Sequence, residues 1–207
     1  MTEPSALPAE RDQVFRLARL TLLLAATDEA YPDGIDAERL GIYDFLAANP
    51  LLLAHADNDP DRVGLLLAGF DDRALSYASP TQRYVTGQES LPGDLARLVA
   101  YGLATCTVSG RIRYRLTDGG HDLAVQFGAM YARSYTVAAR IVVGRLRRLS
   151  GRKLRDNLRK WLTVKAGGHH GRLDPADVIE PHPEATTPTR TAWRTGFPED
   201  KHDRRRR

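Results

Sequence analysis

The sequence predicts a mainly α fold with a small β-wing, and three observations support this prediction. Apolar residues recur at helical spacing through most of residues 10–165. In residues 81–120 the pattern indicates a short helix, a second helix and then two strands, because the apolar period changes from helical spacing to strict alternation. Ser109-Gly110 favours a tight turn between these strands, since glycine adopts positive φ without steric cost. This order of elements is that of a winged helix-turn-helix domain.

Residues 10–26 form the first predicted helix, which is strongly apolar. Residues 1–9 before it contain two prolines and are expected to be a disordered lead-in. The sequence YPDG at 31–34 breaks the helical pattern and separates this helix from the next.

Asp36 is expected to cap the second helix, with Ile35 and Leu40 spaced to form a hydrophobic staple. This helix should stop before Asn49-Pro50, because the residue before a proline disfavours the helical conformation. Residues 63–70 form a short apolar element whose type the sequence leaves open.

The predicted winged unit begins at Ser79-Pro80, since proline fits the first turn of a helix. Gly102 marks the end of its second helix. In the strand that follows the turn, basic and apolar residues alternate, so one face should be basic and the other apolar. The basic residues are Arg111, Arg113 and Arg115, and the apolar ones are Ile112, Tyr114 and Leu116.

A long helical segment is expected from residue 121 to about residue 149, with Leu123, Phe127, Met130 and Tyr131 on one face. Ser150-Gly151 interrupts it, and an amphipathic helix with Leu154, Leu158, Trp161 and Leu162 on its apolar stripe follows. The predicted organisation is therefore a disordered lead-in at 1–9, a winged-helix domain at 10–120, a C-terminal helical segment at 121–166 and a disordered basic tail at 167–207.

The charge is distributed unevenly along the chain. Residues 1–139 hold 12 Lys/Arg and 18 Asp/Glu, a net charge of −6. Residues 140–165 hold 10 Lys/Arg and one acid, a net charge of +9, and residues 166–207 add only +1. The chain therefore has an acidic body and a basic late helical segment. This distribution says more about which partners the chain can bind than the total charge of +4 does.

Cys106 is the only cysteine and is expected to be a small core residue in an apolar strand. The N-terminus does not have the pattern of a signal peptide, and the longest apolar run, at 20–26, is too short to span a membrane. We therefore expect a soluble, cytoplasmic protein that does not bind membranes.

The sequence contains no recognisable catalytic motif, and we expect no enzymatic activity, cofactor or metal. Asp57, Asp59 and Asp61 alternate as in a calcium loop, but the glycine and distal glutamate of an EF-hand are missing. Asp44, an acid among apolar residues, is expected to pair with an arginine. His169-His170 lie in a Gly-rich segment that offers no fixed ligand geometry.

The candidate nucleic-acid or partner contacts are basic side chains of the second winged-unit helix, the wing and the late basic segment. Wing arginines could clamp phosphates, or they could form a solvated face or pair with the acidic body. The late segment could bind phosphate, a membrane surface or an acidic partner helix, or be a plain solvated face. The lack of a broad aromatic face argues against the membrane. These candidates are Arg97, Arg111, Arg113, Arg115, Arg147, Arg148, Arg152, Lys153, Arg155, Arg159 and Lys160.

Three blocks of the sequence resemble the middle components of ABC-three-component systems, which include the small third subunit of Lamassu-type anti-phage defence loci. The blocks are LTLLLAATDEAYPDGIDAERLGIYDFLAANP, YASPTQRYVTGQESLPGDLARLVAYGLATCT with YRLTDGG, and FGAMYARSYTVAARIVVGRLRRLSGRKLRDNLRKWL. The likeness covers roughly residues 10–165 and rests on the order of blocks and their hydrophobic pattern.

The resemblance implies a non-enzymatic winged-helix adaptor that bridges an SMC-like ABC ATPase subunit and an effector subunit, often a nuclease. The ATPase would bind one face of the winged unit, and residues 140–165 would meet the effector or double-stranded DNA. The alternative is a winged-helix transcription regulator, which would bind one operator with nanomolar affinity.

Overall fold

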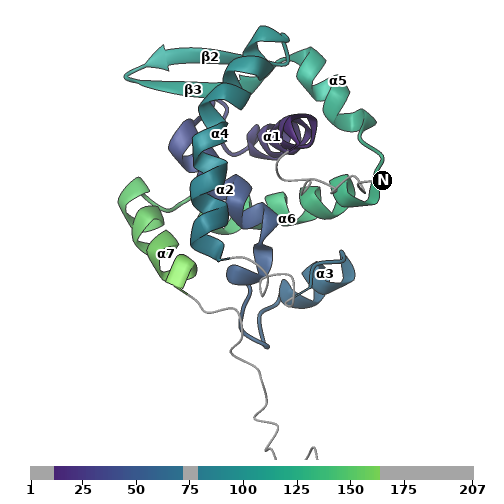
Figure 1. Ribbon diagram of the computed structural model, residues 1–207, viewed down its shortest axis with the longest axis vertical. Helices are drawn as coiled ribbons and strands as arrows, with labels where there is room; N and C mark the ends of the chain where they lie inside the picture. The colour runs from purple at the N-terminus through teal and green to yellow at the C-terminus, as the bar shows by residue number, and fades with distance from the viewer. Residues whose placement is uncertain (1–11, 72–78, 164–207) are drawn as a thin grey trace, which may run out of the picture. The chain divides into compact units, whose positions relative to one another are not determined.

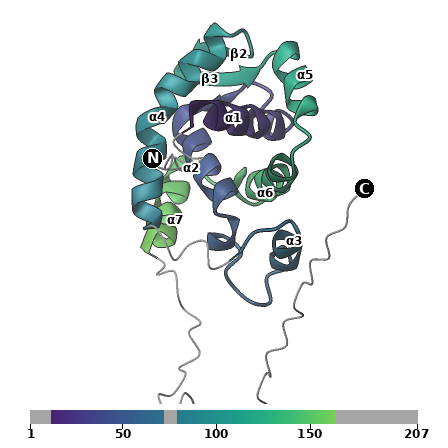
Figure 2. The same cartoon turned by 45° about the vertical axis from the view of Figure 1, so that its right-hand side comes forward.

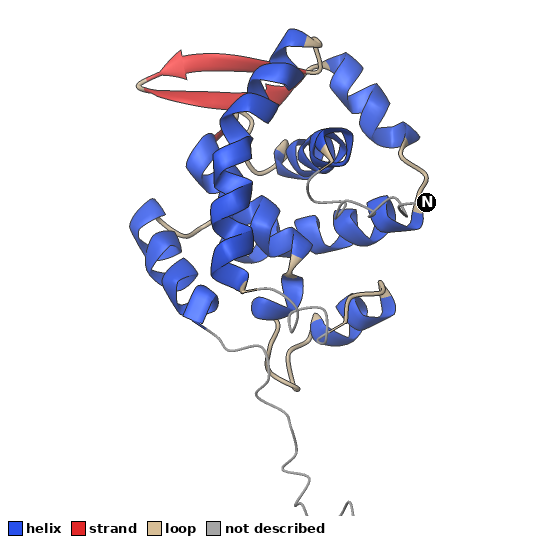
Figure 3. Ribbon diagram, viewed as in Figure 1, coloured by secondary structure: helices blue, strands red, loops and turns tan. Residues whose placement is uncertain are grey.

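The computed structural model describes residues 12–71 and 79–163, and within them the chain is mainly helical with one three-stranded antiparallel sheet (Figures 1 and 3). The predicted lead-in at 1–9 and tail at 167–207 lie outside the described residues. The elements are α1 (Gln13–Thr27), β1 (Ile35–Asp36), α2 (Ala37–Ala48), the 3-10 turn η2 (Pro50–Leu52), α3 (Arg62–Leu67), α4 (Pro80–Ala100), β2 (Ala104–Ser109), β3 (Arg111–Leu116), α5 (Asp118–Gln126), α6 (Met130–Leu146) and α7 (Gly151–Thr163).

Helix α1 is the centre of the core. Asp12 caps it by accepting hydrogen bonds from the backbone N–H groups of Val14 and Phe15. Six consecutive residues, 19–24, are buried, because α2, α4, α5, α6 and strand β3 all contact this helix (Figures 1 and 2). A helix that is apolar almost all round must be covered on every side, as the run LTLLLAA predicts.

The start of α2 confirms the predicted cap. The Asp36 carboxylate accepts a hydrogen bond of 2.9 Å from the backbone N–H of Arg39, and both Ile35 and Leu40 are buried. Ile35 and Asp36 also pair with Tyr114 and Arg113, so β1 joins the hairpin and the strand order is β1-β3-β2.

The predicted pair of helices in residues 81–100 is wrong, because α4 is one helix of 21 residues that contains Pro92. Proline in a helix removes one backbone hydrogen bond but does not have to end the helix when both sides are held by packing. The buried residues Leu91, Leu95 and Leu98 continue one face across Pro92 and hold the helix together. The predicted end is confirmed, since Gly102 has φ of +69° and the Leu103 N–H donates to the Leu98 carbonyl, as in a Schellman motif.

The predicted long helix after residue 120 is also wrong, because it is divided into α5 and α6 at Phe127–Ala129, where Phe127 is extended and Gly128 lies between the two helices. Met130 is 84% exposed, although the sequence pattern assigns it to the apolar face. The break changes the phase of the helix, so that α6 buries a different set of residues: Ala132, Tyr135, Ala138, Ala139, Val142, Val143 and Leu146.

Helix α6 packs against α1 and α2, and its buried residues belong to the same core cluster as theirs. The predicted boundary at residue 120 lies inside α5. Helix α7 matches its prediction, with Leu154 and Leu158 buried against α4 and Trp161 and Leu162 half-buried. Within the described ranges, no helix combines the length and the apolar character that crossing a bilayer would need.

Candidate functional site

The hairpin of β2 and β3 projects from the helices and has two chemically different faces (Figure 1). On one face the cross-strand pairs are Ala104 with Leu116, Cys106 with Tyr114, and Val108 with Ile112. The first pair is buried, Tyr114 is half-buried and Cys106 is exposed. Val108 is 79% exposed and Ile112 51% exposed, so apolar surface lies open toward the tip.

The prediction that Cys106 is a core residue is wrong. The alternation of β2 places it on the apolar face, as expected, but the helices cover only the base of that face. How far a hairpin extends beyond its support depends on tertiary packing, which a pattern of alternation does not report. The exposed pair Val108 and Ile112 was not among the predicted contacts for the same reason.

The opposite face of the hairpin carries the predicted arginines. Arg113 lies 4.0 Å from Asp33, and Arg115 lies 3.7 Å from Asp28. Asp28 also contacts His121 at 2.9 Å. Arg111, near the tip, is exposed and has no ion pair within the described part of the chain. Two of the three arginines on this face therefore lie near acids of the body. Pairing with the acidic body was one of the alternatives that the sequence left open.

Arg97 is the only basic side chain on the outer face of the C-terminal half of α4. It lies 3.5 Å from Asp94, which is buried and is bound more closely by Arg16 of α1 at 2.6 Å. Asp94 therefore joins α1 to α4 and is not available to an outside partner. Apart from Arg97, only Glu89 carries a charge among the exposed residues of α4.

The predicted basic residues of the late segment lie in and beside α7. Arg155 pairs with Glu38 of α2 at 3.1 Å, and Arg159 pairs with Asp156 at 3.0 Å. The others are exposed and have no ion pair among the described residues: Arg147, Arg148, Arg152, Lys153 and Lys160.

The hairpin and α7 do not form one surface cluster. The Thr81 hydroxyl at the start of α4 donates to the Leu162 carbonyl of α7 at 3.4 Å, whereas the hairpin follows the end of α4. In Figure 1 the hairpin lies beyond the C-terminal end of α4, and α7 lies beside the N-terminal half of that helix.

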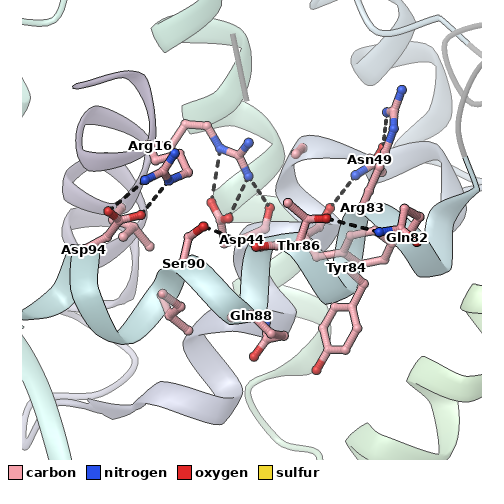
Figure 4. Close-up of a pocket in the computed structure, with 17 residues that line it drawn as sticks. Arg16, Asp44, Asn49, Gln82, Arg83, Tyr84, Thr86, Gln88, Ser90 and Asp94 are labelled. Atoms are coloured by element: carbon pink, nitrogen blue, oxygen red, sulfur yellow. Dashed lines mark hydrogen bonds and ion pairs between the residues drawn. The ribbon is translucent and has the colours of Figure 1, made fainter. Parts of the chain in front are cut away.

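A cavity of about 380 Å³ lies between α1, α2 and α4 (Figure 4). Arg19 crosses its wall and donates to the Asp44 carboxylate at 2.7 Å, and Asp44 also accepts a hydrogen bond of 2.6 Å from Tyr135. Burial alone would lower the pKa of Arg19, but the charge of Asp44 raises it above its ordinary value. Burial raises the pKa of Tyr135. The predicted Asp44–arginine pair is thus confirmed, and its groups serve to join helices.

Acidic side chains of the loop at residues 55–61 form ion pairs with an arginine of α6. Arg145 of α6 donates to Asp59 at 2.8 Å and also binds Asp61, while Asp57 lies 3.7 Å from Arg62. The Arg145 hydrogen bond lowers the pKa of Asp59 to about 2. In the described residues, no group of three or more His, Cys, Asp or Glu could hold a metal ion.

Comparison of the chain with known proteins gives no further assignment. No family model, no curated protein and no solved structure matches it.

Proposed function

We propose that this chain is a non-enzymatic adaptor subunit of a bacterial defence complex, built on a winged helix, whose hairpin docks on a protein partner. The partner that the resemblance implies is an SMC-like ABC ATPase, with a nuclease-type effector bound elsewhere on the chain. The observation that carries the docking role is the exposed pair of Val108 and Ile112 on the apolar face of the hairpin.

The winged-helix assignment is supported by the order and pairing of the elements. Helices α1, α2 and α4 precede a hairpin, and the short strand β1 between α1 and α2 adds to that hairpin beside β3. In this assignment α4 is the helix that would enter a DNA groove and the hairpin is the wing.

A protein partner fits the hairpin better than DNA does. The apolar pair lies on a projecting ribbon, and apolar side chains at the centre of a contact favour a protein surface over a phosphate backbone. Strand β2 is an edge strand, so a partner strand could also extend the sheet. Two of the three wing arginines, Arg113 and Arg115, lie near acids of the body.

Co-purification with a co-expressed SMC-like ABC ATPase tests the proposal. Val108→Asp with Ile112→Asp should abolish the association, because both charges would have to be buried in an apolar contact. The melting temperature of the free chain should change little, since both side chains are exposed in it.

Thr105→Asp with Thr107→Asp is the matched control. Both threonines are exposed and lie on β2, on the face of the hairpin opposite to Val108 and Ile112. The variant adds the same charge to the hairpin but should still co-purify with the ATPase. Equal loss in both variants, or no association of the unmodified chain, would refute the docking role.

The alternative, a transcription regulator, requires several polar or basic side chains on α4 to contact base edges. The exposed face of α4 offers Arg97 and Glu89 as its charged groups, which weighs against it. Gel shifts with competitor DNA at two salt concentrations separate the readings, because only a regulator prefers one operator strongly over random DNA.

A further inference from the structure

The outward face of α6 carries a row of arginines. Arg133, Arg140 and Arg147 are all exposed and follow one another at intervals of seven residues, which places them on one side of the helix. The helical conformation continues through Arg147, the C-cap residue. At 1.5 Å per residue the row spans about 21 Å.

Arg148 follows in the turn before α7, and Arg152 and Lys153 lie in the first turn of α7; all three are exposed. The sequence has no Asp or Glu from residue 123 to residue 155. Two basic side chains of this stretch are neutralised from elsewhere, Arg145 by Asp59 and Asp61 and Arg155 by Glu38. The six cations of the row have no ion pair among the residues that the structure describes.

Helix stability does not account for three of these charges. Arg133 lies near the start of α6, and Arg152 and Lys153 lie in the first turn of α7. A cation near a helix N-terminus is opposed by the helix dipole, so these three residues cost electrostatic energy in the free chain. An anionic ligand would offset that cost.

Gly144 lies on the exposed face of α6 between Arg140 and Arg147, and a Cβ atom there would meet nothing within 4 Å. Glycine weakens a helix interior relative to alanine, and here no neighbouring group requires it. The absence of a side chain lets an extended backbone approach the helix closely in the middle of the arginine row.

We propose that this row, formed by Arg133, Arg140, Arg147, Arg148, Arg152 and Lys153, binds the phosphate backbone of double-stranded DNA without reading its sequence. Five of the six are arginines, whose planar guanidinium matches phosphate oxygens better than a lysine does. The exposed bulky apolar side chains beside the row are Met130 at the start of α6 and the 39%-exposed Val137, which are too few for the broad apolar face of a membrane-binding helix.

The inference goes beyond the proposed function, because that function assigns the hairpin to a protein partner and names no contact with DNA. It does not use the hairpin, and its test needs only the purified chain. Loss of ATPase association and loss of DNA binding are therefore separate results, and either proposal can fail alone.

The test uses the full-length chain and a labelled duplex of random sequence, with affinity followed by fluorescence anisotropy across a series of salt concentrations. Arg133→Gln with Arg140→Gln and Arg147→Gln removes three charges of the row. Each phosphate contact contributes a slope of about −0.9 to log K against log[salt], so the slope should become shallower by about 3. At about 0.1 M salt the affinity should fall by several hundredfold on the same basis.

The matched control is Arg111→Gln with Arg159→Gln and Lys160→Gln, which removes the same charge from the hairpin and from α7. It should change the affinity by less than about tenfold. Circular dichroism should confirm that both variants keep the helical content of the unmodified chain.

Three results would overturn the proposal. One is equal loss in both variants, which means that binding follows total charge. Another is absence of duplex binding by the unmodified chain at about 0.05 M salt, where non-specific DNA binding is stronger than at physiological salt. The third is competition by polyglutamate or by phosphatidylserine vesicles as effective as that by DNA, since an acidic protein or a lipid surface would then be the partner.

Discussion

Gly120, the third residue of α5, lies against the turn that ends α4. A Cβ atom at this position would be 2.1 Å from the Leu103 carbonyl oxygen, a backbone atom that the Schellman motif and the Thr117 contacts hold in place. Gly119 beside it has open space, with the Thr117 hydroxyl 3.8 Å away as its nearest neighbour. The two glycines of the sequence DGG therefore have different roles.

We expect Gly120→Ala to lower the free energy of unfolding by about 2–3 kcal/mol, because overpacking against fixed backbone forces α5 to move. Gly119→Ala should be neutral or stabilise by up to about 1 kcal/mol, since alanine is the better helix former. Urea denaturation of both variants gives the comparison. Similar values for the two would mean that α5 is free to shift.

Asp44 compensates the buried charge of Arg19 and also accepts the Tyr135 hydroxyl. Asp44→Asn keeps the size and an acceptor oxygen but leaves Arg19 without its counter-charge. We expect a loss of about 3 kcal/mol in the free energy of unfolding, because an unpaired buried charge is strongly destabilising.

Adding Arg19→Met to Asp44→Asn should restore more than half of that loss, since no charge then remains buried. A double variant that is less stable than Asp44→Asn would show that Arg19 contributes mainly through packing on Phe15 and Tyr135, whose rings lie 5.9 and 5.4 Å from its guanidinium.

At the scale of elements, the loop at 55–61 and helix α6 depend on each other through Arg145. The pKa of Asp59 is lowered from 3.8 to about 2 in the folded chain by the Arg145 hydrogen bond. A lowered carboxyl pKa stabilises the folded state above the unfolded pKa, and this contribution is lost as the pH falls through the folded value.

The free energy of unfolding should therefore decrease between about pH 4 and pH 2 more steeply for the unmodified chain than for Asp59→Asn. Other carboxylates titrate in the same range, so the informative quantity is the difference between the two curves from thermal unfolding at each pH. Parallel curves would mean that the Asp59–Arg145 pair does not contribute to stability.

Helices α4, α5 and α6 show where a pattern of residues misleads. Pro92-Gly93 in α4 predicts an end that packing overrides, and Gly128 between α5 and α6 is an end that the apolar periodicity conceals. In both cases the deciding contacts come from residues far away in the sequence. Local propensity is a weak predictor under these conditions.

For the whole molecule, we expect the two proposed surfaces to be separable. The hairpin variant Val108→Asp with Ile112→Asp should bind DNA as the unmodified chain does within a factor of about 5, allowing for its two added negative charges. The arginine-row variant should still co-purify with the ATPase. Both DNA affinity and co-purification with the ATPase should therefore be measured in each variant. Loss of both activities in either variant would indicate one continuous interface.

The sequence alone determined the helical character, the capping of α2 by Asp36 and the end of α4 at Gly102. It also determined the two faces of the hairpin and the Asp44–arginine pair. Local conformation and short-range chemistry carry this information. Tertiary structure decided that Cys106 and Val108 are exposed, that Arg113 and Arg115 lie near acids, and that Arg145 is neutralised while Arg133, Arg140 and Arg147 are not. Charge counted along a chain does not reveal which charges meet, since the pairing of distant side chains depends on how the helices pack.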